Sequence, residues 1–367
     1  MSDALKDIYT NEFIQKFGDK VKSAYQDFPS EKFVKSVLLP PWGELPLRAR
    51  MYRIVEVLGT CLPGDYKDAL NILFSIEKEC TGFPYLFFPD FVAAFGQSEE
   101  HLELSMAALK RFTKLSSSEF AIRPFILKDP DFAMKYMLKW STDSNEHVRR
   151  LSSEGCRPRL PWSMDLPMFK EDPRPILKIL ENLKADSSLY VRKSVANNLN
   201  DIAKDNPEIV ITTAKNWIGK APDTDWILRQ GCRTLVRKAT PEALALFGYA
   251  KNVEEQPLYQ TASLTVIPEK LTIGDSCELT YSIDLDWDTN ARIRIEYGID
   301  FIKSNGKPSR KLFLLTDKTV SGKVTLSGSR KHSFANLTTR RHYPGIHRIV
   351  LLINGQEAAQ VSLTLKL

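Results

Sequence analysis

The sequence contains little cysteine, and its few cysteines are widely separated. There are five in 367 residues, at Cys61, Cys80, Cys156, Cys232 and Cys277. Their number is odd and no two have the short spacing of metal ligands, which argues against a disulfide framework and against a zinc site. This distribution is typical of a protein in a reducing compartment.

Long apolar segments are also missing from the sequence. No stretch approaches the roughly 20 apolar residues that a membrane-spanning helix needs. The N-terminal segment, MSDALKDIYTNEF, mixes acids and bases and lacks the apolar core of a signal peptide. We therefore expect a soluble cytoplasmic protein that has no membrane partner.

The composition allows a sizeable core and an anionic partner. Hydrophobic residues make up 43% of the chain, so global disorder is excluded. The formal net charge is +6, which permits binding to an anion such as nucleic acid but does not require it. A chain of this length predicts about two domains.

The pattern of apolar residues changes near residue 255. Before about Ala250, segments such as MYRIVEVLGTCLPG have apolar residues three and four apart, which predicts helices. After about Leu258, segments such as ARIRIEYGI and RKLFLLT alternate apolar and polar residues, which predicts strands. We expect a helical domain over residues 1–252, a linker over 253–257 and a β-sandwich over 258–367.

The helical part contains an internal repeat. DSNEHVRRLSSEG, DSSLYVRKSVANNL and DTDWILRQGCRTL each place an arginine six residues after an aspartate. The repeated pairs are Asp143 with Arg149, Asp186 with Arg192 and Asp223 with Arg229, and the arginines are 43 and 37 residues apart. This period is typical of HEAT repeats, which stack helix pairs into an α-solenoid. Such Asp and Arg residues usually connect neighbouring repeats, and that structural interpretation is favoured here.

The repeat alignment brings two acids onto one surface. Glu154 lies five residues after Arg149, and Asp201 lies one helical turn beyond the equivalent position in the next repeat, Asn197. Glu154 and Asp201 should therefore project from the same face. In the third repeat the matching region is cationic, with Arg233, Arg237 and Lys238.

A third acid, Glu119, lies in the segment LSSSEF. Each of the three acids also has a structural interpretation. Glu119 and Ser116 have the spacing of a capping box, Glu154 has the spacing of a helical ion pair with Arg150, and Asp201 matches a solvated helix acid.

The segment VRRLSSEGCRPRLPW closely resembles the HEAT-repeat DNA alkylation repair glycosylases of the AlkC/AlkD superfamily, and in particular the AlkC branch. The resemblance continues through VRKSVANNLNDIAKDNP and covers roughly residues 1–250. Some AlkC-type members also carry a C-terminal immunoglobulin-like domain, which fits the strand-rich half. The expected fold class is thus a HEAT-like α-solenoid followed by an immunoglobulin-like β-sandwich.

The resemblance implies a monofunctional DNA glycosylase that acts on 3-methyladenine and 3-methylcytosine. It also implies that the enzyme engages the lesion in bent duplex DNA without drawing the base into a deep pocket. Position by position, Glu119, Glu154 and Asp201 match the active-site carboxylates, and Trp162 matches the aromatic residue against the damaged nucleotide. The sequence shows no departure at these four positions.

The chemistry of such lesions fits carboxylates. A base methylated at N3 is positively charged and is already a good leaving group. The enzyme must stabilise an oxocarbenium-like deoxyribose and direct a water to C1′, and carboxylates do both. We expect Glu154 or Asp201 to position the water and Glu119 to add electrostatic stabilisation. No cofactor and no metal are expected.

Basic residues near these acids are candidates for DNA contacts. Gly155 and Pro158 should end the helix, so that the Arg157-Pro158-Arg159 turn grips backbone phosphates and Leu160-Pro161 sets the angle of Trp162. The DNA contacts expected on the helical part are Arg149, Arg150, Arg157, Arg159, Arg233, Arg237 and Lys238.

The second half predicts a sandwich of seven or eight strands with a strongly basic segment. RRHYPGIHRIVLLING resembles the tyrosine corner and following strand of an immunoglobulin fold, and Asn354-Gly355 predicts a hairpin turn. Between residues 303 and 348 there are eleven lysines and arginines and one acid, Asp317. We expect a second phosphate-binding surface there, made by Lys307, Arg310, Lys311, Arg330, Lys331, Arg340 and Arg341. A generally basic solvated face is the alternative.

Two other functions stay open at this point. A HEAT scaffold without catalysis is one, because fold alone does not give function. A protein that only binds alkylation damage, or one that acts on RNA, is the other. The expected partner is double-stranded DNA with alkylated bases, bound by a monomer associated with the nucleoid.

Overall fold

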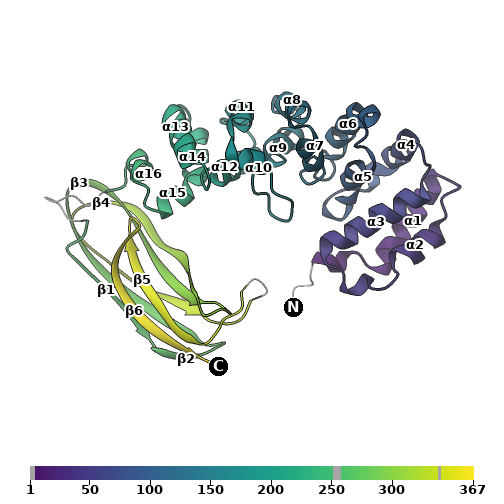
Figure 1. Ribbon diagram of the computed structural model, residues 1–367. Coiled ribbons are helices and arrows are strands. Elements are labelled where there is room, and N and C mark those ends of the chain that lie inside the picture. Colours follow the sequence, from purple (N-terminus) through teal and green to yellow (C-terminus); the bar gives the residue numbers. More distant parts are fainter. Residues whose placement is uncertain (1–4, 251–257, 338–339) are drawn as a thin grey trace. The chain divides into compact units, whose positions relative to one another are not determined.

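The computed structural model describes residues 5–250, 258–337 and 340–367, and Figure 1 shows their helices and strands. Contacts divide the chain into two compact units. The helical unit comprises the residues up to Val210 together with Asn216–Gly231, and the second unit comprises Ile211–Lys215 and Cys232–Leu367. Each unit is described by itself below.

The helical unit is built from short amphipathic helices. In chain order they are α1 (Asn11–Ala24), α2 (Ser30–Val37), α3 (Leu47–Cys61), α4 (Tyr66–Ile76), α5 (Phe87–Phe95), α6 (Leu102–Phe112), α7 (Arg123–Lys128), α8 (Pro130–Trp140), α9 (Glu146–Glu154), α10 (Pro167–Glu171), α11 (Arg174–Leu183), α12 (Leu189–Ile202), α13 (Pro207–Trp217) and α14 (Pro222–Gly231). Single 3-10 turns lie at Leu5–Ile8, Trp42–Glu44, Glu77–Glu79, Phe83–Tyr85 and Glu99–His101. Helix α13 contributes residues to both units.

Helices of successive repeats pack side by side. Helix α9 contacts α8, α11 and α12, and α12 contacts α14 (Figure 1). Local sequence explains where these helices begin: Asn145 accepts hydrogen bonds from the first turn of α9, and Asp129 accepts one from Phe132 at the start of α8. The packing is that of HEAT-like pairs, as the repeat predicts.

The repeated aspartates and arginines form a ladder between repeats. The Arg149 Nε lies 2.6 Å from the Asp186 carboxylate, and the Arg192 Nη1 lies 3.3 Å from that of Asp223. Each arginine also donates to the backbone carbonyl of the aspartate six residues before it, at 3.0 Å for Arg149 and 2.8 Å for Arg192. The structure therefore has the inter-repeat connection that the spacing predicts.

The second unit is a β-sandwich preceded by two short helices, α15 (Arg233–Arg237) and α16 (Pro241–Leu246). Its strands are β1 (Thr261–Ile267), β2 (Lys270–Thr272), β3 (Ser276–Ile302), β4 (Pro308–Ser333), β5 (Gly345–Ile353) and β6 (Gln356–Lys366). They are ordered β1-β3-β5-β6-β2, with β4 paired to β3, and all neighbours are antiparallel except β2 and β6. The predicted helical half followed by a β-sandwich is confirmed.

The expected count of seven or eight strands is wrong for the described residues, which form six. Strands β3 and β4 are 27 and 26 residues long, and they pair with each other from one end to the other. The register shifts there, between Trp287 and Ala291, so a bulge takes the place of a loop. The hairpin at Asn354-Gly355 joins β5 to β6, with left-handed φ values of 46° and 82°.

The residues that follow α16 contact the sandwich. The Asn354 side chain donates to the carbonyl of Ala250 at 2.8 Å, and the Tyr249 hydroxyl donates to Asp317 at 2.7 Å. The domain boundary expected at residue 252 stays a prediction, because the linker expected at 253–257 lies outside the described residues.

Candidate active site

Helix α9 leads directly into the loop that carries the candidate aromatic residue. The helix ends at Glu154, and the chain continues through Gly155 into the turns that contain Pro158 and Trp162. A side chain at position 155 would not fit, because an added Cβ would lie 2.6 Å from Ile122 Cγ2. Trp162 has a left-handed φ of 64° and is 62% exposed, which is unusual for a large aromatic residue.

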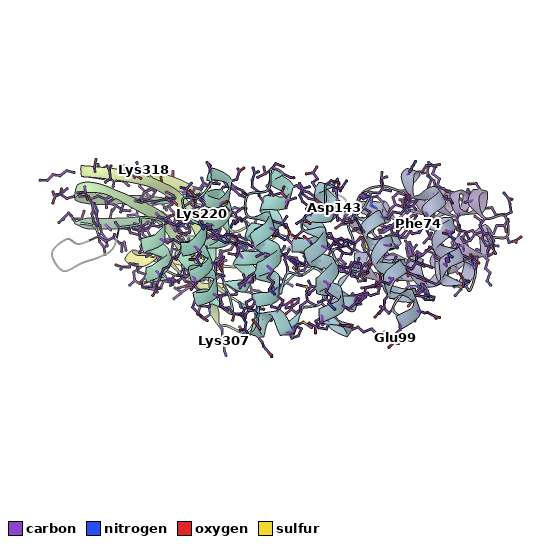
Figure 2. All side chains as sticks on the ribbon, turned by 90° about the horizontal axis from the view of Figure 1, so that it is seen from above. Phe74, Glu99, Asp143, Lys220, Lys307 and Lys318 are labelled. Carbon is purple, nitrogen blue, oxygen red and sulfur yellow. The ribbon has the colours of Figure 1, made fainter. Side chains whose placement is uncertain are left out.

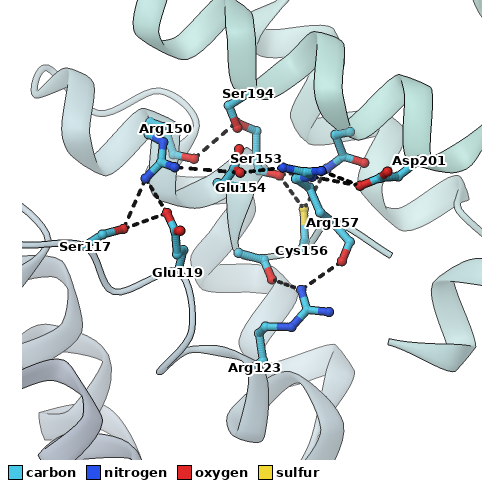
Figure 3. Close-up of polar contacts among 12 residues, drawn as sticks. Ser117, Glu119, Arg123, Arg150, Ser153, Glu154, Cys156, Arg157, Ser194 and Asp201 are labelled. Atoms are coloured by element: carbon cyan, nitrogen blue, oxygen red, sulfur yellow. Dashed lines mark hydrogen bonds and ion pairs between the residues drawn. The ribbon is translucent and has the colours of Figure 1, made fainter. Parts of the chain in front are cut away.

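Glu154 and Asp201 lie on either side of one guanidinium (Figure 3). Arg157 Nη1 donates to Glu154 Oε1 at 2.6 Å, and Arg157 Nε donates to Asp201 Oδ2 at 2.8 Å. Lys204 approaches the other oxygen of Asp201 at 2.8 Å. Both carboxylates are buried, as is Arg157, so the structure brings the acids of adjacent repeats together through a shared arginine.

Glu119 joins the same cluster through a second arginine, Arg150 (Figure 3). The Arg150 guanidinium contacts Glu119, donates to Ser117 Oγ at 3.1 Å and lies 3.7 Å from Glu154 Oε1. Its carbon Cζ lies 4.7 Å from the centre of the Tyr190 ring. Arg150 is therefore held between two carboxylates and against an aromatic face.

The structural alternatives for these acids have different outcomes. The capping-box interpretation of Glu119 is wrong, because α7 begins only at Arg123 and Ser116 donates instead to the carbonyl of Gly82. The ion pair of Glu154 with Arg150 is present, but it is longer than the pair with Arg157.

The two arginines stay charged in spite of their burial. Burial opposes the charged form of Arg150, but Glu119 and then Glu154 outweigh it and raise the pKa of Arg150 above its usual value. Burial likewise opposes the charge of Arg157, and Glu154 with Asp201 raises its pKa. The cluster is thus a fixed array of alternating charges.

A cavity of about 520 Å³ opens over this cluster. Glu119, Glu154 and Arg150 contribute to its wall, together with the aromatic rings of Phe120, Trp162 and Tyr190. Planar rings and carboxylates on one cavity suit a flat, positively charged ligand.

The sequence interpretation missed Arg123, which is fully buried behind the cluster. It donates to the carbonyls of Gly155 at 2.9 Å, Arg157 at 2.8 Å and Met164 at 2.8 Å. Burial lowers the pKa of Arg123 to about 10. Its contacts span both ends of the loop that carries Trp162. The only signal in the sequence is an arginine within the apolar segment FAIRPFIL.

The arginines expected to bind DNA occupy several different environments. Arg149 belongs to the ladder, and Arg150 and Arg157 lie within the acidic cluster. Arg157 is 9% exposed and contacts a carboxylate on each side, and it also lines the cavity, so its expected phosphate contact stays a prediction. Arg159 is more accessible, and it pairs with Asp205 at 2.6 Å.

The remaining basic candidates belong to the second unit. Arg237 lies 3.8 Å from Glu296, a residue of β3, and Lys238 follows it at the end of α15. Arg233 begins the same helix.

Part of the basic surface of the sandwich is neutralised. Arg310 pairs with Asp300 at 2.7 Å and with Glu357 at 2.5 Å, and these acids lie outside the basic sequence segment. Arg340 lies over Phe301, with 4.7 Å from its Cζ to the ring centre. The candidates with exposed side chains are Lys307, Lys311, Arg330, Lys331 and Arg341. Figure 2 shows Lys307 and Lys318 extending from the surface of this unit.

The described residues contain neither a group of metal ligands nor a membrane-spanning helix. Among residues 5–250, 258–337 and 340–367, no three His, Cys, Asp or Glu side chains are grouped so as to hold a metal ion. No helix of this described part is long and apolar enough to cross a membrane.

Comparison with known proteins gives matches over the whole chain. Residues 260–367 match the family model described as the C-terminal Ig-like domain of the uncharacterised protein YhaZ. The uncharacterized protein YhaZ of Bacillus subtilis (strain 168) is 45% identical over 352 residues, which are 96% of each chain. The structure of the Pseudomonas fluorescens alkylpurine DNA glycosylase AlkC, bound to DNA containing an abasic site analog, is 37% identical with a TM-score of 0.91. That match covers 99% of this chain and 100% of the AlkC chain.

Proposed function

The chain belongs to the AlkC branch of the AlkC/AlkD superfamily, and on this basis we propose that it is a monofunctional DNA glycosylase that removes alkylated bases. The proposed substrates are cationic lesions, 3-methyladenine and 3-methylcytosine, in bent duplex DNA and without deep base flipping. The observation that carries the proposal is that Glu119 and Glu154 share the wall of one cavity with Trp162, while Arg157 connects Asp201 to Glu154.

The three carboxylates suit the proposed hydrolysis of the N-glycosidic bond. In this reaction the cationic base leaves with the bonding electrons, so it departs neutral, and positive charge develops on the deoxyribose. Buried, fixed carboxylates stabilise that charge without having to reorganise. Glu154 or Asp201 then accepts a proton from the water that attacks C1′. Trp162 provides the surface against the damaged nucleotide.

Release of free base from methylated duplex DNA tests this proposal. The intact protein is compared with Glu154→Gln and Asp201→Asn, which preserve shape and remove charge. Asp172→Asn serves as the control, because Asp172 pairs with Arg174 on the surface and lies outside the cavity. We expect the intact protein and the control to release base, and both cluster variants to lose about 100-fold or more in rate.

The alternatives predict different results. A non-catalytic scaffold would release no base and show no preference for methylated DNA. A protein that only binds damage would prefer methylated DNA but release nothing. Loss of folding, monitored by thermal unfolding of each variant, separates a chemical effect from a structural one.

The exposed cations of the sandwich are proposed as a second DNA contact, with double-stranded DNA as the partner of a monomeric protein in the cytoplasm. Each phosphate contact adds about 0.9 to the slope of log affinity against log salt concentration. Replacing Arg330 and Lys331 by glutamine should therefore weaken binding and flatten this slope. Lys270→Gln, on β2 at the other end of the strand order, is the control. An unchanged slope in the double variant would leave the basic surface as a solvated face.

A further inference from the structure

A second, smaller hollow adjoins the acidic cavity. It encloses about 300 Å³ and shares two wall residues with that cavity, Phe120 and Trp162. This volume is at the lower end of the roughly 300–1,000 Å³ of ordinary ligand sites, so it suits one small planar group. Trp162 thus borders two separate spaces and not one.

The chemistry of the hollow differs from that of the cavity. Its one acid, Asp90, is 3% exposed and fully engaged by Arg48, at 2.9 Å to one carboxylate oxygen and 3.1 Å to the other. The Arg48 guanidinium lies over Phe120, with its Cζ 4.6 Å from the ring centre, and over Tyr52 at 5.0 Å. Arg48 also donates to the Tyr52 hydroxyl at 3.2 Å. The pair is electrically balanced, and the hollow offers aromatic and aliphatic surface.

The backbone of Trp162 points to a functional reason for this arrangement. A tryptophan with a left-handed φ is strained, and such strain persists only where the surroundings impose it. Here Arg123 holds the carbonyls on both sides of the loop. An exposed, rigidly presented aromatic side chain is suited to entering a base stack and separating its neighbours.

We propose that the hollow receives an undamaged, uncharged nucleobase that Trp162 separates from the lesion. This inference rests on the proposed function. The carboxylate cavity favours the cationic lesion, whereas the balanced Arg48–Asp90 pair and the rings of Tyr52 and Phe120 favour a neutral heterocycle. The base comes either from the neighbouring position on the lesion strand or from the position opposite the lesion.

The test uses duplex DNA with a stable abasic-site analogue, so that binding is measured without catalysis. The fluorescent base 2-aminopurine is placed next to the analogue in one duplex and opposite it in another. We expect its fluorescence to change on binding in one of the two duplexes, which identifies the source of the base. Ala93→Phe, which fills the hollow, should abolish this change and weaken binding about tenfold.

A second variant and a control keep the test decisive. Tyr52→Ala removes a stacking surface that is already 48% exposed, so folding should survive and the fluorescence change should shrink. Ala107→Phe places the same bulk on an exposed position of α6 outside the hollow and should behave as the unmodified protein.

The proposal is overturned if neither duplex changes in fluorescence, or if Ala93→Phe and Tyr52→Ala bind and respond like Ala107→Phe. Base release by the unmodified protein is measured in parallel. Release without a fluorescence response rejects the hollow and keeps the glycosylase, while absence of release rejects the proposed function itself.

Discussion

Replacing Arg123 by methionine is expected to slow base release much more than it destabilises the helical unit. Arg123 is 0% exposed, and its side chain donates hydrogen bonds to backbone carbonyls of the loop that carries Trp162. Among the described residues no carboxylate forms an ion pair with it. Its side chain therefore acts as a clamp between the end of α9 and Met164.

Two opposing contributions set the effect on stability. Methionine leaves the carbonyls of Gly155, Arg157 and Met164 without their donor, at about 1–3 kcal/mol each. Removing a buried cation that has no ionic partner recovers several kcal/mol of desolvation. The two nearly offset each other, so we expect a loss of about 1–3 kcal/mol in the free energy of unfolding.

The effect on activity has no such compensation. Without the clamp, the backbone of Arg157 and the position of Trp162 are no longer fixed, and misplacement by about 1 Å costs about 100-fold in rate. Arg123→Lys keeps the charge but cannot reach both ends of the loop. Its rate of base release should therefore lie between those of the unmodified protein and Arg123→Met. The assays are single-turnover base release and urea unfolding, with Arg174→Met as the exposed control.

Two results would refute this reasoning. One is base release by Arg123→Met at the rate of the unmodified protein. The other is a loss of activity that follows the unfolded fraction at every urea concentration, since a clamp must act on the folded protein. Faster proteolysis or amide exchange confined to residues 156–164 would support it.

Two further predictions concern packing and pH. Gly155→Ala should lower the free energy of unfolding by about 1–3 kcal/mol, because its Cβ would overlap with Ile122, and a change below about 0.5 kcal/mol in urea unfolding would contradict this. In the sandwich, burial lowers the pKa of His332 to about 4, below its value in the unfolded chain. As pH falls from about 6.5 to 4, the imidazole therefore takes up a proton only in the unfolded chain. Stability should therefore decrease as pH falls through this window, and His332→Gln should reduce the slope of melting temperature against pH. The same slope in His332→Gln and the unmodified protein would show that other titrating groups dominate.

Features that depend on helical periodicity were predictable from the sequence. The ladder of Arg149 and Asp186 follows from spacing within two repeats, and the meeting of Glu154 with Asp201 follows from aligning them. Periodicity places a residue on a face, and stacking brings equivalent faces together. No long-range information was needed for either.

Features that depend on burial were not predictable. Arg157 was expected only as part of a turn that grips phosphates, and nothing in the sequence indicated its two ion pairs with acids from different helices. The ion pairs within the basic segment of the sandwich were equally invisible in the sequence. Arg310 is compensated by Asp300, which lies opposite it on β3, and by Glu357 of β6, which is distant in sequence.

The charge balance of the cluster explains why a site proposed for a cationic lesion contains arginines. The three carboxylates are matched by Arg150, Arg157 and Lys204, which pairs with Asp201. Carboxylates without these partners would attract any cation strongly, including an intact substrate, and equal binding of substrate and transition state does not accelerate a reaction. In the proposed reaction the positive charge moves from the base to the sugar. Carboxylates that arginines hold in fixed positions stabilise positive charge at one place more than at another. The arginines therefore lower the affinity of the site for the substrate, while the carboxylates still stabilise the charge that develops on the sugar.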